Sequence, residues 1–341
     1  MEYDLITNIE SCYTEIPSLL YYSHIPPAMI VLLFGIFVFF KSASNRLAGR
    51  ILFLISIFSF AWVSVEGMIW LQYSSINMML LWSFLGILYA IIHILSLYFV
   101  YVMLDKQDIS LNKKYIFAIL LLPIIFLTPT VYNLSGFDIV NCQSIESNYF
   151  IGYRYCIGII SIFWILALLY SRYRKSDRES KKQILLLGFG ILSFLLLFSW
   201  SEMVGSFTQS FEITQYGLFG MPIFVAFLAY LIVKFKAFDI KLLGAQALVV
   251  AQFILIASIF TFATSTVNRI LVAITLVITS GAGWFLVQSV KKEVKRKEEL
   301  QRLSDKLAAA NERLRQLDIE KSEFISIASH QLRTPLTAIK G

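Results

Sequence analysis

The stretch NMMLLWSFLGILYAIIHILSLYFVYVML, residues 77–104, decides the fold of this chain. It contains no Asp, Glu, Lys or Arg, and His93 is its only side chain that titrates near neutral pH. A helix needs about 20 apolar residues to cross the hydrocarbon core of a bilayer. This stretch is longer than that, so we expect a membrane-spanning helix that is tilted or extends beyond the core.

Eight other apolar runs have a similar length. Hydrophobic residues make up 58% of the 341 residues and charged residues 15%, whereas soluble proteins carry about 25% charged residues. The mean hydropathy of +0.72 points the same way. The sequence therefore predicts an all-α, polytopic helical membrane bundle of about nine spans, at 19–40, 51–72, 77–104, 115–133, 151–170, 183–204, 214–233, 242–264 and 269–290.

The basic residues indicate the orientation of these spans. The loops 41–50, 105–114, 171–182 and 234–241, together with the tail from Lys291, carry 27 of the 29 Lys and Arg residues. Basic loops stay on the cytoplasmic side of a membrane, so we expect the N-terminus outside and the C-terminus inside. The same distribution accounts for the net charge of +7 without a nucleic-acid partner.

The first 18 residues contain four acidic residues and no basic one. A signal peptide needs a positive start, so we interpret this segment as a short extracytoplasmic tail rather than a cleaved signal. The chain has three cysteines, Cys12, Cys142 and Cys156, which are too few for a disulfide framework. The sequence allows two interpretations: one disulfide on the outer side, or three free thiols.

The composition becomes highly charged from Lys291 onward. No proline or glycine lies between Gly283 and Pro335, which allows one helix to continue out of the last span. From Leu300 to Ala328, eight of the nine positions spaced alternately by three and four residues are apolar, which is typical of a coiled coil. A lone amphipathic helix would leave this stripe in water, so we favour a parallel homodimer.

The stretch FISIASHQLRTPLTAIKG, residues 324–341, places His330 on this helix. In the coiled-coil register His330 lies off the apolar seam, where its imidazole is free to act as a nucleophile. Pro335 cannot donate a hydrogen bond to the carbonyl of Gln331, so we expect a bend beside the histidine. An exposed histidine on a helix usually has no function, so a role for His330 has to be argued from the residues around it.

The string S-H-Q-L-R-T-P-L, with Phe324 upstream and I-K-G downstream, closely resembles the phosphoacceptor box of sensor histidine kinases. The stretch YLIVKFKAFDI, residues 230–240, is similar to the exit of the seven-helix N-terminal sensor region of some bacterial histidine kinases. The resemblance implies that the chain enters the first helix of a dimerisation and histidine-phosphotransfer hairpin. It also implies a multi-pass protein of the bacterial cytoplasmic (inner) membrane with a cytoplasmic C-terminus.

The resemblance implies a role for each residue of the box. His330 would accept the γ-phosphoryl group of ATP and pass it to an aspartate of a response regulator. Thr334 matches the position that helps to orient water when such kinases dephosphorylate their regulator, and Arg333 and Pro335 match structural members of the box. Gln331 departs from the family, in which many members carry Glu or Asp. An amide can fix the imidazole tautomer but supplies no negative charge.

The chain contains no recognisable nucleotide site. It lacks the G-x-x-x-x-G-K-[ST] loop and the D-x-G-x-G pattern that the resemblance would require. We therefore expect no cofactor-binding and no metal-binding residues here, and we place ATP with Mg in a catalytic domain beyond this sequence. The chain is expected to be a truncated product or an incomplete gene model of a longer kinase, inactive alone.

Ionisable residues inside spans are costly and therefore mark candidate functional sites. Glu66, Arg154 and Glu202 fall at a similar depth below the outer surface, and His93 falls near the middle of its span. One interpretation is that Arg154 pairs with one of the two glutamates and holds helices together. The other is that these residues line an outward-facing pocket for a small ligand or a proton-linked signal.

Together these patterns favour a homodimeric receptor-type sensor kinase in a lipid bilayer, with an unknown stimulus. A transporter or channel with an oligomerising coiled-coil tail would predict midplane charges, broken helices or repeats. A methylated chemoreceptor-like adaptor would predict a much longer helical hairpin. The expected parts are a tail at 1–18, a seven-helix sensor region at 19–241, a two-helix membrane hairpin at 242–290, a coiled-coil signalling helix at 291–322 and the start of the phosphoacceptor domain at 323–341.

Overall fold

The computed structural model describes residues 16–42, 46–235 and 266–339. The chain divides into two compact units, Met1–Val287 and Gln288–Gly341. Most of the described residues are helical. The helices of the first unit up to Phe235 are α2 Leu20–Lys41, α3 Arg46–Ile69, α4 Ser75–Asp105, α5 Leu111–Leu127, α6 Asn148–Lys175, α7 Arg178–Thr208, the 3-10 turn η1 Phe211–Ile213, the single turn α8 Thr214–Gly217 and α9 Gly220–Phe235.

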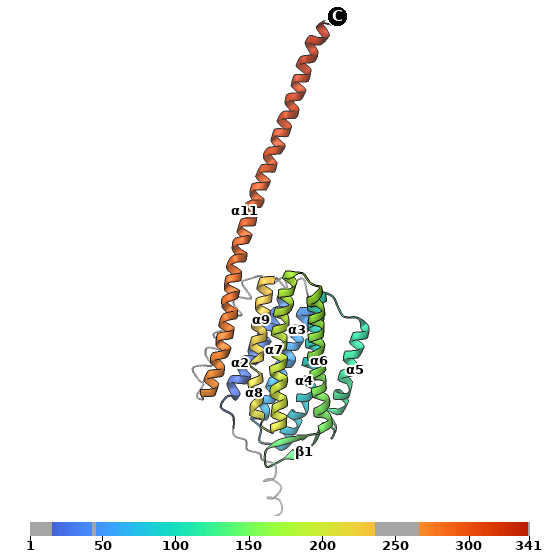
Figure 1. Ribbon diagram of the computed structural model, residues 1–341, viewed down its shortest axis with the longest axis vertical. Helices are drawn as coiled ribbons and strands as arrows, with labels where there is room; N and C mark the ends of the chain where they lie inside the picture. Colours follow the sequence, from blue (N-terminus) through green and yellow to red (C-terminus); the bar gives the residue numbers. More distant parts are fainter. Residues whose placement is uncertain (1–15, 43–45, 236–265, 340–341) are drawn as a thin grey trace, which may run out of the picture. The chain divides into compact units, whose positions relative to one another are not determined.

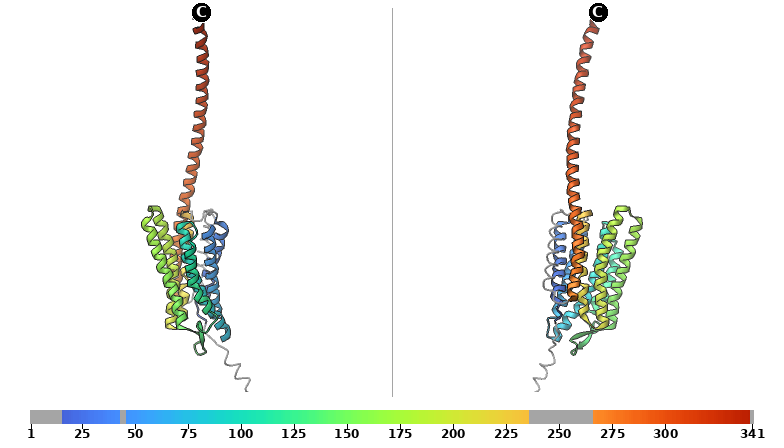
Figure 2. Two further views of the ribbon diagram at one scale, coloured as in Figure 1. Left: turned by 90° about the vertical axis from the view of Figure 1, so that its right-hand side faces the viewer. Right: turned by 60° about the vertical axis from the view of Figure 1, so that its left-hand side comes forward.

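The long helices of the first unit pack side by side in a closed ring (Figure 1). In order around the ring, α2 packs on α3, α3 on α4, α4 on α6, α6 on α7 and α7 on α9, and α9 returns to α2. Helix α5 lies outside the ring, against α4 and α6. Figure 2 shows from two further sides that these helices run roughly along one common direction.

Aromatic side chains fill the centre of the ring. Phe198 contacts the ring of Trp62 edge-on at 4.7 Å between centroids and stacks on Tyr89 at 5.4 Å and on Phe194 at 5.9 Å. Phe194 in turn stacks on Phe224 at 5.6 Å. Because these residues come from α3, α4, α7 and α9, their contacts tie four helices together, and each such pair adds about 0.5–1.5 kcal/mol beyond the burial of its area.

The outer surface of the ring is also apolar. Phe40, Phe163, Leu185 and Phe189 are each more than half exposed. Soluble monomers rarely expose apolar patches of this extent. Among the described residues six helical segments are long and apolar enough to cross a membrane. They match six of the expected spans: Leu20–Phe40, Arg46–Ile69, Ser75–Asp105, Asn148–Lys175, Arg178–Thr208 and Phe211–Ile232.

The expected span at 115–133 differs from the structure. Helix α5 has 17 residues and ends at Leu127, because the following polar residues form turns. Asn133 closes them by donating hydrogen bonds to the carbonyls of Thr128 (3.0 Å) and Ser83 (3.1 Å). Ser83 lies near the start of α4, whereas α5 begins just after the end of α4. Helix α5 therefore runs back along most of α4.

A β-hairpin follows α5, which an all-α prediction did not include. Strand β1 Leu134–Asp138 pairs antiparallel with β2 Gln143–Glu146. Asp138 closes the turn between them by accepting hydrogen bonds from the side chain of Asn141 (2.7 Å) and the backbone of Val140 (2.9 Å). Bonds from Asn141 and Val140 hold the pKa of Asp138 below its usual value. The hairpin lies at the end of the ring where α6 begins (Figure 1).

The last two expected spans are not confirmed. The run 242–264 lies outside the described residues. The run 269–290 lies within α11, a single helix of 74 residues from Thr266 to Ile339, whose apolar part Arg269–Gly281 is shorter than a full span. Both Figure 1 and Figure 2 draw α11 as one unbroken ribbon.

Helix α11 continues past Pro335, so this proline does not end it. In the second unit the leucines of the predicted coiled-coil seam are uncovered in the single chain. Their exposed fractions lie between 56% and 67% for Leu300, Leu303, Leu307, Leu314 and Leu317. A stripe of this kind on one long helix is the surface that a second helix covers in a coiled coil.

Candidate functional site

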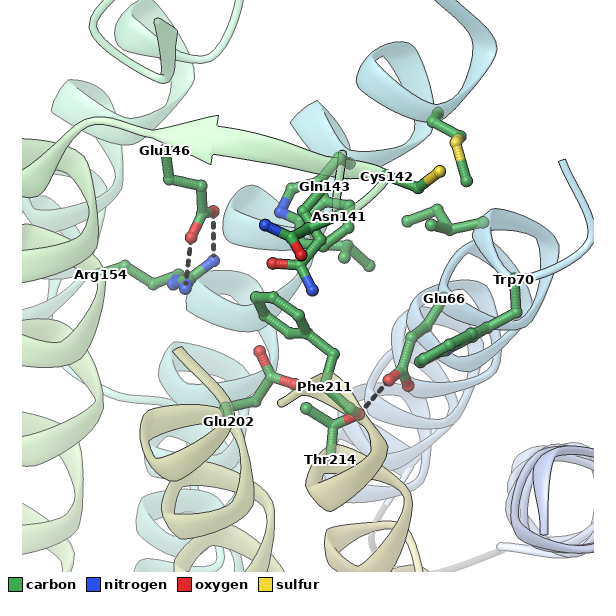
Figure 3. A pocket seen from close by; sticks show the side chains of 14 residues that line it. Glu66, Trp70, Asn141, Cys142, Gln143, Glu146, Arg154, Glu202, Phe211 and Thr214 are labelled. Atoms are coloured by element: carbon green, nitrogen blue, oxygen red, sulfur yellow. Dashed lines mark hydrogen bonds and ion pairs between the residues drawn. The ribbon is translucent and has the colours of Figure 1, made fainter. Parts of the chain in front are cut away.

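One pocket lies at the hairpin end of the ring, and we call it the hairpin pocket (Figure 3). Its cavity volume is about 60 Å³. Because one water needs roughly 10–15 Å³ of such space, the cavity suits a few waters or a small ligand. It is lined by Glu66, Ile69, Trp70, Met78, Trp82, Leu85, Asn141, Cys142, Gln143, Glu146, Arg154, Glu202, Phe211 and Thr214.

Three of the four ionisable residues predicted from the spans meet in this pocket. Glu66 comes from the end of α3, Arg154 from the start of α6 and Glu202 from the last turns of α7. All three side chains are buried, with exposed fractions of 6%, 2% and 6%. Their similar depth in the sequence therefore corresponds to a common position in the fold.

Arg154 pairs with neither of the predicted glutamates. Its two terminal nitrogens donate hydrogen bonds to the two carboxylate oxygens of Glu146, at 2.8 and 3.1 Å. Glu146 ends strand β2, so this bidentate pair attaches the hairpin to α6. Arg154 also donates to the hydroxyl of Tyr155 at 3.2 Å, and that hydroxyl donates to the backbone carbonyl of Glu202 at 3.0 Å. The arginine thus links the hairpin to α7 as well.

Glu66 is held from two sides. Thr214 of α8 donates a hydrogen bond to its Oε1, and Nε2 of His24 lies 3.2 Å from its Oε2. Nδ1 of His24 lies 2.9 Å from the carbonyl oxygen of Leu20. These contacts hold the imidazole of His24 between the start of α2 and the carboxylate of Glu66.

Glu202 differs from the other two glutamates. Within the part of the chain that the structure describes, no donor reaches its carboxylate. Figure 3 shows this side chain pointing toward the cavity between Phe211 and Arg154. A buried carboxylate without a hydrogen bond is costly, and such a group facing a cavity is a candidate ligand-binding group.

His93, the fourth predicted residue, does not line the pocket. It is fully buried in the ring. Its Nδ1 donates to the carbonyl of Tyr89 at 2.9 Å, and its Nε2 lies 2.8 Å from the hydroxyl of Ser199. The same hydroxyl accepts a hydrogen bond from Tyr89. Because both ring nitrogens are satisfied inside the protein, His93 serves the packing of α4 against α7.

The apolar wall of the pocket includes Trp70, Trp82 and Phe211, the last two in edge-to-face contact at 4.9 Å. Two tryptophans that lie near the predicted residues in sequence are elsewhere. Trp62 is buried in the ring core, and Trp200 is more than half exposed on the outside of α7. The pocket therefore combines buried ionisable groups with aromatic surface.

The turn of the hairpin covers the pocket. Cys142 lies in that turn, lines the cavity and is disulfide-bonded, whereas Cys156 is free. The disulfide restrains the turn that carries Asn141 and Gln143. Asn141 is exposed, so the pocket reaches the surface at this turn.

Sequence reasoning missed two ionisable members of the site. His24 lies inside the first span, and the same cost of an ionisable group in a span would have identified it. Glu146 lies in a connecting loop, where no periodic pattern predicted a strand. The box residues His330, Gln331, Arg333, Thr334 and Pro335 all lie on α11. Within the described residues, no cluster of three or more His, Cys, Asp or Glu could hold a metal ion.

Comparison with known protein families, with curated proteins and with solved structures gives no match for this chain.

Proposed function

We propose that this chain is the membrane sensor and phosphoacceptor part of a sensor histidine kinase of a two-component system. The observation that carries the proposal is the string S-H-Q-L-R-T-P-L around His330 on α11, a helix that also contains the apolar segment Arg269–Gly281. In the proposal, α11 carries the signal from its apolar segment to His330.

The orientation in the proposal has the hairpin end outside the cell and the opposite end in the cytoplasm. The opposite end carries basic residues, including Arg172, Arg174 and Lys175 in the last turn of α6, and such residues favour the cytoplasmic side. The disulfide of Cys142 at the hairpin end supports the same orientation, since disulfides persist in oxidising compartments. The membrane is proposed to be a bacterial cytoplasmic membrane.

The proposed chemistry takes place at His330. A ring nitrogen of the imidazole attacks the γ-phosphorus of ATP, the bond to the bridging oxygen breaks, and ADP leaves with the electron pair. The resulting phosphoramidate then transfers its phosphoryl group to an aspartate of a response regulator. ATP with Mg would bind to a catalytic domain, since these 341 residues carry neither of the two nucleotide-binding patterns. The exposed leucine stripe of α11 supports a homodimer.

The hairpin pocket supports a receptor rather than a transporter. Its buried charges lie at one end of the ring, next to the hairpin, whereas transporter sites lie near the midplane of the bilayer. The histidine expected near the midplane, His93, is closed into the ring core by hydrogen bonds to Tyr89 and Ser199. A pocket at one end of the ring suits the binding of an external stimulus, whereas transport would need a binding site near the midplane of the bilayer.

The proposal is tested by supplying a catalytic domain in trans. The chain, reconstituted in nanodiscs, is incubated with labelled ATP and the catalytic domain of a related histidine kinase. We expect an acid-labile label that His330→Gln abolishes. We expect Gln331→Glu, which adds the carboxylate that many family members carry, to keep the label and to increase its rate of formation. Label that persists in His330→Gln would refute the assignment.

A further inference from the structure

We propose that the hairpin pocket binds one small organic cation, an alkylammonium, beside the carboxylate of Glu202. Binding itself follows from the pocket alone. The role of this cation as the stimulus of the kinase rests on the proposed function.

One carboxylate of the pocket has no hydrogen-bonding partner. Glu66 is held by Nε2 of His24 and by the hydroxyl of Thr214. Glu146 accepts two hydrogen bonds from the guanidinium of Arg154. Glu202 remains, with an exposed fraction of 6% and no hydrogen bond to its carboxylate among the described residues. It is therefore the carboxylate that can receive a donor from a ligand, and a cation beside it favours its charged form.

The lining of the pocket favours an organic cation over a metal ion. Metal cations such as Ca²⁺ and Mg²⁺ prefer about six or more oxygen ligands, and Glu202 offers the one carboxylate in this pocket that is not already paired. Trp70, Trp82 and Phe211 instead provide aromatic surface, which attracts ammonium groups through the negative face of the ring. The alkyl groups of such a ligand would contact these rings while its N–H donates to Glu202.

The size of the cavity limits the ligand. A volume of about 60 Å³ corresponds to only a few water molecules, so the ligand is a small ammonium rather than a peptide or a lipid. Because Glu202 belongs to α7 and the other walls come from α3, α4, α6, η1, α8 and the hairpin, a bound cation would contact elements from several sides of the ring. Such a ligand could change how these elements pack.

The inference is tested with trimethylammonium chloride on the full chain in detergent. Trimethylammonium has one N–H for Glu202 and three methyl groups for the aromatic wall. Tert-butanol also has three methyl groups and one hydrogen-bond donor, but it carries no charge. We expect trimethylammonium to raise the melting temperature in a saturable way, and tert-butanol at the same concentration to have no such effect. Sodium chloride controls for ionic strength.

Glu202→Gln removes the charge and keeps the shape of the side chain. We expect it to weaken the apparent affinity for trimethylammonium by at least about tenfold, because one partner of a buried charge pair is lost. Glu212→Gln makes the same change at an exposed position next to Phe211 and is expected to leave the affinity unchanged.

Equal effects of trimethylammonium and tert-butanol, or an unchanged affinity in Glu202→Gln, would overturn the proposal. If Glu202→Gln does not fold, the comparison of the two compounds on the unaltered chain decides. No part of this test uses ATP or His330, so its result is independent of the kinase assignment. Binding without any effect on the labelling of His330 would refute only the role of the cation as the stimulus.

Discussion

Arg154 and Glu146 show what burial does to a pair of charges at the scale of single residues. Their side chains have exposed fractions of only 3% and 6%. The cost of burying a charge predicted that Arg154 would have an acidic partner. It did not predict which acidic residue this would be. Glu146 lies eight residues before Arg154, at the end of strand β2, in a segment whose sequence has no helical pattern.

The pair makes a prediction about stability. Arg154→Met leaves Glu146 buried without a partner, and breaking a buried pair typically costs about 3–5 kcal/mol. We expect a marked fall in melting temperature for this variant. Adding Glu146→Gln to Arg154→Met is expected to recover a large part of the loss, because the unpaired charge is removed. Strictly additive effects of the two substitutions in thermal melts would contradict the pairing.

At the scale of elements, the apolar runs predicted the positions of most helices correctly, but they did not predict where each helix ends. Six expected spans correspond to helices because a run of about 20 apolar residues in a bilayer has to satisfy its backbone internally. The run 115–133 was wrong at its end, where Pro129 and Asn133 belong to turns. The hairpin was missed since strands of five and four residues, LSGFD and QSIE, carry too little alternation to be recognised.

The hairpin gives a prediction of its own. Cys142 is disulfide-bonded and Cys156 is free, so the two cysteines form a matched pair of substitutions. We expect Cys142→Ser to lower the stability of the oxidised chain, by an amount of about 2–4 kcal/mol for a typical disulfide. Cys156→Ser should have little effect. The melting temperature of each variant is compared with and without a reductant.

The reductant provides the control within this experiment. It should lower the melting temperature of the unaltered chain and of Cys156→Ser, and it should change that of Cys142→Ser little. A hairpin that is held only by its backbone and by the pair Arg154–Glu146 would instead give equal melting temperatures for both cysteine variants.

At the scale of the whole molecule, the proposed function depends on two chains meeting along α11. The apolar seam was predicted from spacing, and the leucines are exposed along the described single helix. A single chain cannot show the partner, since the contact that covers the stripe comes from outside it. The sequence pattern and the exposed leucines therefore both favour the association of two chains along α11.

The seam can be tested with one substitution and a matched control. Leu307→Arg places a charge at a seam position and is expected to abolish dimers in cross-linking of the reconstituted chain. Ala309→Arg introduces the same side chain two residues away, off the predicted seam, and should leave dimers intact. Equal amounts of cross-linked dimer in both variants would mean that the stripe is not the interface.

The position of the phosphoryl group on the chain tests the central claim most directly. After incubation with ATP and the catalytic domain in trans, peptides are mapped by mass spectrometry at neutral pH, where phosphohistidine survives. The account predicts phosphorylation of the imidazole of His330. An unmodified His330, or phosphate only on the nearby hydroxyls of Ser326, Ser329 or Thr334, would contradict it.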